Sequence, residues 1–189
     1  MIISHGAFGI EFEWLATEGE PALSYRFRAG EHALGSAGLE RSLTASRADV
    51  TQLLRHEGNR RHDSWRERPR EGLLRELQAA LIVDFDWAVD PGPHWDAHSR
   101  FVALPVDAPA FRGWSGFLVE AGDVARLMWA RHERGAPVLE QRLAPGDFEA
   151  ALKAFHAVLE QPASSRQSTP PTSGERFVGM PGSQRKSAS

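Results

Sequence analysis

Two neighbouring stretches of alternating apolar residues constrain the fold of this chain more than any other feature. Apolar residues occupy every second position from Phe8 to Trp14, and again from Leu23 to Ala29. A period of two is typical of a β-strand with one buried face. The polar residues 17–21, which include glycine and proline, separate the two stretches. We therefore predict an antiparallel hairpin with strands over residues 8–17 and 22–29.

The predicted pairing also places four charged residues together. Glu11 and Glu13 fall on the same sheet face as Arg26 and Arg28. Opposite charges across two strands favour a register by about 0.2–1 kcal/mol per pair. The simplest interpretation is a solvated sheet face, and a binding role for this face is the alternative.

Later in the chain, apolar residues recur with a helical period of 3.6. This pattern predicts helices near residues 47–57, 70–82 and 147–159. Ser46 is the expected N-cap of the first helix, with Asp49 as a weak capping partner and Gly58 at its end. Pro69 is placed to start the second helix, and Asp147 is placed to cap the third.

The remaining apolar segments predict further strands. Short strands are expected near residues 32–34, 101–104 and 114–120, and a second hairpin over 124–131 and 137–143. Residues 124–131 also fit a helical period, and this alternative stays open. The predicted fold class is α+β, mainly an antiparallel β-sheet packed by about three helices.

The composition indicates one globular domain followed by a tail. The chain has 189 residues, of which 41% are hydrophobic, and this suits a single domain over residues 1–160. Residues 161–189 are rich in serine, proline, glutamine and glycine, so we expect a disordered tail. The chain has no apolar run long enough to cross a bilayer, no basic leader and no cysteine. We therefore expect a cytoplasmic protein that does not engage a membrane.

The distribution of charge argues against nucleic acid as a partner. The chain has 22 basic and 25 acidic residues. Four basic residues and one acidic residue lie in 161–189, so residues 1–160 carry 18 basic and 24 acidic side chains. An acidic surface repels phosphates, whereas it attracts a basic protein. A modest negative charge that serves solubility alone is the alternative interpretation.

Motifs for catalysis are sparse. The chain lacks a glycine-rich phosphate loop in the required context and a Gly-x-Ser-x-Gly elbow. The closest approach to a metal site is His94, Asp96 and His98, which would share one face only if the segment were a strand. We predict no enzymatic activity and no cofactor, with a small metal-dependent enzyme built on these three residues as the less favoured alternative.

The segment from residue 84 to residue 98 is the best candidate for a partner-binding site. It combines four aspartates, two tryptophans and the turn formers at 91–93, which is typical of a long surface loop. Aromatic side chains beside charges are common in binding hot spots. The predicted partner-binding residues are Asp84, Asp86, Trp87, Asp90, Trp95 and Asp96.

The other tryptophans fall into two groups. Trp14, Trp114 and Trp129 lie in predicted strands and are expected in the core. Trp65, like Trp87 and Trp95, lies in a polar connecting segment. Each of these three rings either anchors a partner or covers the core of its own domain.

Several short motifs carry a resemblance to a known family. They are Phe8-Gly9-Ile10-Glu11-Phe12, Gly58-Asn59-Arg60, the strand from Gly113-Trp114 to Glu120, Arg126-Leu127-x-Trp129 and Gly146-x-Phe148. In order and spacing they resemble immunity protein family forty-two of bacterial polymorphic toxin systems, over about residues 1–160. The resemblance implies a cytoplasmic inhibitor that binds and neutralises a cognate toxin delivered by a neighbouring cell. An effector chaperone or adaptor is the alternative binding protein.

Overall fold

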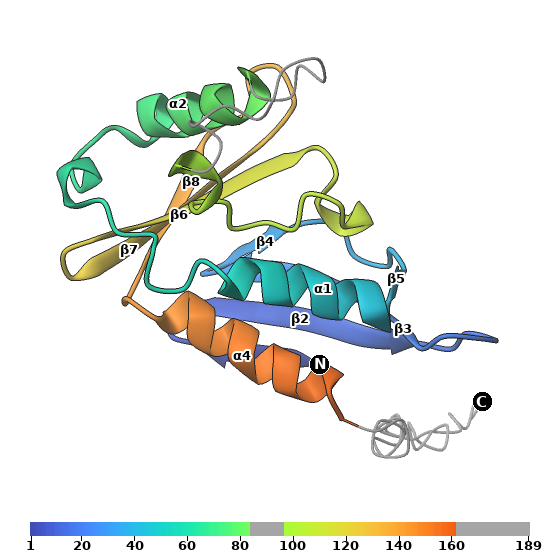
Figure 1. The fold of residues 1–189 in the computed structure, drawn as a ribbon. Helices are drawn as coiled ribbons and strands as arrows, with labels where there is room; N and C mark the ends of the chain where they lie inside the picture. The colour runs from blue at the N-terminus through green and yellow to red at the C-terminus, as the bar shows by residue number, and fades with distance from the viewer. Residues whose placement is uncertain (84–96, 162–189) are drawn as a thin grey trace, which may run out of the picture.

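The computed structural model describes residues 1–83 and 97–161, which form two antiparallel sheets with helices packed on them (Figure 1). The first sheet contains β1 (Ile2–His5), β2 (Phe8–Leu15), β3 (Ala22–Ala29), β4 (His32–Leu34) and β5 (Arg41–Ser42). The second contains β6 (Trp114–Ala121), β7 (Val124–Arg131) and β8 (Leu139–Leu143). The helices are α1 (Leu43–Leu54), α2 (Arg70–Val83) and α4 (Asp147–Leu159), with 3-10 turns η1 (Asp63–Trp65) and η2 (Pro109–Phe111). The predicted α+β class is confirmed.

The N-terminal hairpin has the predicted register. Glu11 lies opposite Arg26 across β2 and β3, and Arg26 donates to both carboxylate oxygens of Glu11 at 3.0 and 3.1 Å. Arg28 donates to the same carboxylate at 3.4 Å. Burial alone would raise the pKa of Glu11, but the hydrogen bonds and charges of the two arginines outweigh it and lower that pKa. Three of the four charged residues of this face, Glu11, Arg26 and Arg28, are thus paired with one another.

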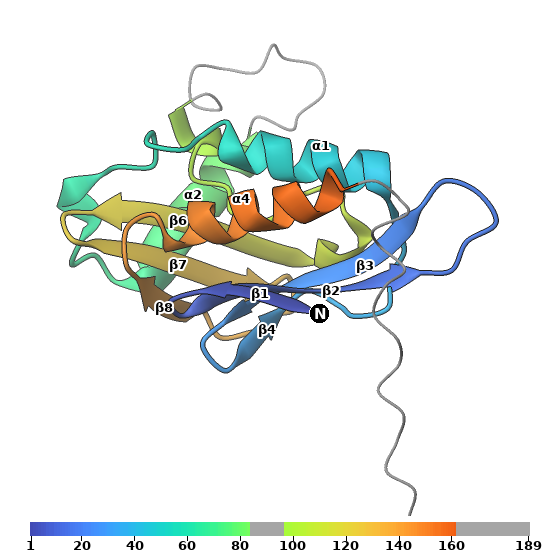
Figure 2. The same cartoon turned by 90° about the horizontal axis from the view of Figure 1, so that it is seen from below.

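Helices α1 and α4 pack side by side over the other face of the first sheet (Figures 1 and 2). The aromatic residues of β2 meet those of α4, with ring centroids 4.8 Å apart for Phe8 and Phe148 and 5.1 Å apart for Phe12 and Phe155. Aromatic pairs at this separation stabilise a core beyond the area that they bury. The second strand and the last helix of the described chain therefore share one core.

The second sheet is buried on both faces. One face, with Leu118 and Leu127, joins the core under α1 and α4. The other face, with Phe117 and Met128, packs against the buried leucines of α2 in a second core. Residues 124–131 form a strand as favoured. The second strand of that hairpin covers residues 139–143, and the strand expected at 101–104 is reduced to a single bridge between Val102 and Phe117.

The cap of α1 differs from the prediction. The helix begins at Leu43, and Ser42 is the N-cap whose side chain accepts a hydrogen bond from the Ala45 amide at 3.2 Å. Ser46 instead lies inside the helix and donates to the Ser42 carbonyl at 2.9 Å. Asp49 is buried and engages other elements. A hydroxyl four residues into a helix bonds backward to a carbonyl, so it cannot also cap the helix.

The start of α4 is also corrected. Gly146 is the N-cap and has a φ of +88°, a left-handed conformation that favours glycine. Asp147 is the first helical residue and makes no capping hydrogen bond. Its charge still lies in the first turn, where a negative side chain stabilises a helix.

The predicted disordered tail falls almost entirely on residues 162–189, which lie outside the described residues. Among the helices that the structure describes, none has both the length and the apolar character that a bilayer span requires.

Candidate protein-binding surface

The predicted partner-binding residues lie outside the described residues. All six of them, from Asp84 to Asp96, fall between the last residue of α2, Val83, and the helical turn at residues 97–99. What the structure describes is the surface on which both ends of this segment are anchored.

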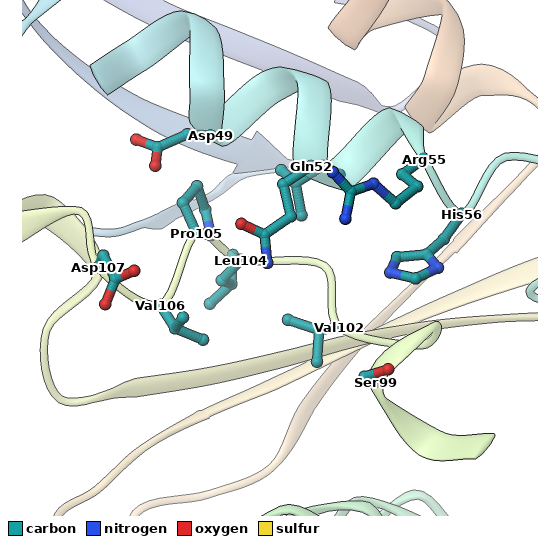
Figure 3. Close-up of a pocket in the computed structure, with 11 residues that line it drawn as sticks. Asp49, Gln52, Arg55, His56, Ser99, Val102, Leu104, Pro105, Val106 and Asp107 are labelled. Carbon is teal, nitrogen blue, oxygen red and sulfur yellow. The ribbon is translucent and has the colours of Figure 1, made fainter. Parts of the chain in front are cut away.

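A hollow of about 320 Å³ lies between α1 and residues 99–107 (Figure 3). Gln52 and His56 point into it from α1 and the turn that follows. Val102 and Leu104 supply apolar side chains on the opposite side. Burial, followed by the charges of Arg60 and Arg55, lowers the pKa of His56. Both causes favour the uncharged imidazole of His56 at this hollow.

A second hollow of about 390 Å³ lies on the other side of residues 102–106. Its lining is mainly apolar and includes Leu81 of α2, Phe111, Trp114 and Phe117. The hollow therefore suits apolar groups, with few polar atoms to orient them.

Residues 102–106 form a wall shared by the two hollows. Val102, Leu104, Pro105 and Val106 line both. Val106 is 63% exposed, one of four large apolar residues exposed in the described part of the chain. Gly116 allows the wall to lie against β6, since a Cβ there would be 2.5 Å from Leu104 Cγ. An exposed valine beside a mainly apolar hollow suits contact with another protein.

A serine and a histidine meet at the rim of the second hollow. Ser115 Oγ and His132 Nε2 are 2.7 Å apart. In nucleophilic catalysis a third group, usually a carboxylate, orients the histidine. No carboxylate contacts His132 in the part of the chain that the structure describes. Within the described residues, the pair is therefore a polar contact at the rim without a third, orienting group.

The predicted metal ligands are only partly described. His94 and Asp96 lie outside the described residues, whereas His98 lies in the turn at residues 97–99. Among residues 1–83 and 97–161, no group of three or more metal-ligating side chains comes together. The metal site over residues 94–98 remains an untested alternative.

The described tryptophans are mostly structural. Trp129 is 1% exposed, and Trp14 and Trp114 pack against the first core. Trp65 is also buried and stacks on His62 with ring centroids 3.7 Å apart. The ring of Trp65 thus covers the second core of its own domain.

Sequence reasoning missed the buried ion pairs around the two cores. Arg60, in a segment interpreted as a basic connection, is fully buried and donates to Glu149 of α4 and to the Leu53 carbonyl. Arg126 of β7 likewise bonds Glu140 and the Trp65 carbonyl. Arg60 and Glu149 are 89 residues apart in the sequence, and Arg126 and Glu140 are 14 apart. Neither pair therefore has a local sequence pattern from which it could be predicted.

A third buried cluster supports the wall of the first hollow. Asp49 lines this hollow and accepts hydrogen bonds from Tyr25 at 2.7 Å and from both Nε and Nη2 of Arg41. Arg41 also donates to the Asp107 carbonyl at 3.1 Å. Burial and the charge of Asp49 raise the pKa of Tyr25 well above its usual value. The cluster joins β3, α1 and the segment that follows the wall.

Comparisons with known proteins report on the fold. The chain is similar in structure to CdiI from Burkholderia dolosa AUO158, with a TM-score of 0.57 over 82% of this chain and 99% of CdiI. The two are 17% identical in sequence, so the likeness shows a shared fold. No protein-family model and no curated protein matches the chain. Membership of immunity protein family forty-two therefore stays a prediction.

Proposed function

We propose that this protein is an immunity protein that binds and neutralises a cognate toxin in interbacterial competition. The observation that carries the proposal is the structural likeness to CdiI, an immunity protein of contact-dependent inhibition. The alignment spans 99% of CdiI, so it includes the whole of that fold and is not limited to a common hairpin. The short sequence motifs that resemble an immunity family lead to the same expectation. Inhibition by binding requires a surface and no catalytic group.

We further propose that residues 84–96 contribute to the toxin interface, together with the two hollows beside them. Leu81, two residues before the end of α2, lines the second hollow, and Ser99 lines the first. Both ends of the segment are therefore anchored at the same surface. Four aspartates in the segment suit a basic surface on the toxin, and its two tryptophans offer large apolar areas.

Toxicity rescue tests the function. If the neighbouring gene encodes a candidate toxin domain, as the proposal expects, that domain is expressed under control in a susceptible bacterium, with or without this protein. An immunity protein restores growth and forms a complex with the purified toxin domain. Growth arrest in the presence of folded protein would overturn the proposal, and binding without rescue would favour the chaperone or adaptor.

Charge reversal tests the segment. Asp86→Lys and Asp90→Lys should slow association with the toxin domain and flatten its salt dependence, because rim charges act mainly on the rate of encounter. Asp123→Lys is the matched control, since this exposed aspartate lies on the turn between β6 and β7. The measurement is stopped-flow binding at several salt concentrations. Equal rates for all three variants would place the acidic contact elsewhere.

Truncation of the two tryptophans tests the apolar contact. Trp87→Ala and Trp95→Ala should speed dissociation, by about tenfold or more if each ring is an anchor. A thermal melt of each variant accompanies the measurement, because a destabilised fold would imitate lost binding. Unchanged dissociation from folded variants would remove both rings from the interface.

A further inference from the structure

The edges of the two sheets differ in how well they are protected. The outer edge of β6 is covered, because residues 60–62 and 101–103 donate to it or accept from it. β8 carries the charged Glu140 and Arg142, and β4 and β5 are only three and two residues long. Covering, charge and shortness are the usual ways in which proteins prevent an edge from pairing with another chain.

The edge strand β1 has no neighbouring strand on its outer side among the residues that the structure describes. Met1 and Phe12 exchange two hydrogen bonds of 2.7 and 2.9 Å between β1 and β2. In an antiparallel ladder such pairs alternate with pairs that do not bond to each other. Because Ile2 and Ser4 lie at the alternate positions of the register, their N–H and C=O groups point away from β2.

Two of the exposed side chains along this edge are large and apolar, and Ser4 and His5 are exposed and polar. Met1 is 64% exposed and Ile2 is 56% exposed, which makes them two of the four exposed large apolar residues among those described. Ile3 points the other way and packs against the core. Residues 2–5 contain no lysine, carboxylate or proline. Within the described residues, β1 therefore combines an uncovered ladder with two exposed apolar side chains, and its only protection is its length of four residues.

We propose that β1 accepts an extended strand of the toxin, which adds to the first sheet at its open edge. This inference rests on the proposed function and names a second contact region on the same partner. Only an extended backbone satisfies N–H and C=O groups spaced two residues apart along one edge. The exposed side chains of Met1 and Ile2 call for apolar residues on the added strand.

The small size of the edge favours the toxin over a second copy of this chain. A stable interface buries about 1,200–2,000 Å² in total. A four-residue strand paired with its own copy supplies a small part of that area. On the proposed function, a toxin binds through a larger interface, and the added strand would be one part of it.

The test compares Ser4→Pro with Ser4→Ala. Proline removes the outward N–H and adds a ring at the edge, whereas alanine keeps the N–H and removes only the hydroxyl. Because the Ser4 amide does not bond to β2, proline fits this position on an edge strand. Ser4→Pro should weaken binding to the toxin domain by about tenfold or more, and Ser4→Ala should leave it within about twofold. Thermal melts check that both variants are folded.

Ile2→Lys serves as a second variant that leaves the backbone unchanged. A charge on an edge strand opposes pairing with another strand, so this variant should also weaken binding. Amide hydrogen exchange adds a direct readout. The amides of Ile2 and Ser4 should exchange rapidly in the free protein and slowly in the complex, while that of Ile3 stays protected in both.

The outcomes separate this inference from the proposed function. Rescue by the wild-type protein together with full binding by folded Ser4→Pro, or with unprotected Ile2 and Ser4 amides, would overturn strand addition and leave the function standing. Failure of the wild-type protein to bind or to rescue would overturn both. Concentration-dependent dimerisation that Ser4→Pro abolishes, with toxin binding unchanged, would assign the edge to a second copy.

Discussion

At the scale of single residues, buried charges connect distant parts of the chain. Arg60 is the clearest case, because it lies beside exposed arginines yet is completely buried. Burial lowers the pKa of its guanidinium, and the charge of Glu149 opposes that shift. The Arg60 Nε and the second oxygen of Glu149 have no hydrogen-bond partner in the described structure. When one residue of such a buried ion pair is removed, the other is left as a buried charge without a partner, which strongly destabilises the fold.

Replacing Arg60 should therefore destabilise the fold severely. We expect Arg60→Met to lower the free energy of unfolding by about 3–5 kcal/mol, because Glu149 is left buried without its partner. The adjacent Arg61→Met is the control and should change it by less than about 0.5 kcal/mol, since its ion pair with Asp63 is exposed. Urea denaturation measures both. Similar midpoints for the two variants would contradict a structural role for the buried pair.

Tyr25 should give the domain a characteristic loss of stability in alkaline solution. Its pKa is raised above the usual value of 10.0 in the folded state. The neutral phenol is thus favoured by folding, so this contribution is complete below pH 10 and declines as the pH rises above it. Tyr25→Phe should flatten that decline and lower the unfolding free energy at pH 7 by about 0.5–1.5 kcal/mol, because one hydrogen bond to Asp49 is lost.

Tyr25 is the only tyrosine in the chain, so its ionisation can be followed directly by ultraviolet absorbance. Denaturant midpoints measured from pH 7 to 11 test the stability. A folded protein whose tyrosine titrates near pH 10 would contradict the prediction.

At the scale of helices and strands, the spacing of apolar residues predicted the elements that have one buried face and one exposed face. The hairpin of β2 and β3 was predictable because one face is buried and the other is paired through Glu11 and Arg26. β7 was harder to predict, because it is buried on both faces and so lacks alternation. The start of α1 was missed because Ser42 and Ser46 both suit an N-cap, and only the tertiary pairing of β5 with β3 selects Ser42.

The cap of α1 makes its own prediction. Ser42→Ala should lower the unfolding free energy by about 0.5–2 kcal/mol, because the Ala45 amide loses its acceptor. Ser42→Asp should retain most of the stability, since aspartate caps a helix equally well. Chemical denaturation compares the two. An alanine variant as stable as the wild type would show that the hydrogen bond contributes nothing.

At the scale of the whole molecule, the sequence predicted an acidic α+β domain with a binding function. The described structure adds the positions of two hollows and of an uncovered sheet edge at β1. The two hollows on either side of Val106 could not be predicted, because α1, α2 and β6 are brought together only by tertiary packing. The composition of residues 84–96 alone led to the predicted aspartates and tryptophans of the binding site. These residues lie outside the part of the chain that the structure describes. The open edge of β1 likewise depends on a register that sequence alone left unassigned.

The tail should contribute little to folding. Truncation after Gln161 removes residues 162–189, which hold few apolar side chains to offset the entropy of ordering. The melting temperature should therefore stay nearly unchanged in a thermal scan. A fall of more than about 5 °C, equivalent to roughly 1–3 kcal/mol at this chain length, would show that the tail docks on the domain.

The contact of α4 with β1 and β2 has a consequence for how the protein is made. Phe8 and Phe12 emerge early from the ribosome, whereas Phe148 and Phe155, which cover them, are added more than a hundred residues later. At about 5–20 residues per second, synthesis of the intervening chain takes on the order of ten seconds. During that interval the aromatic face of the hairpin is not covered by α4 and is prone to non-specific association. The nascent chain therefore exposes an aggregation-prone surface until α4 has been synthesised and the domain can fold.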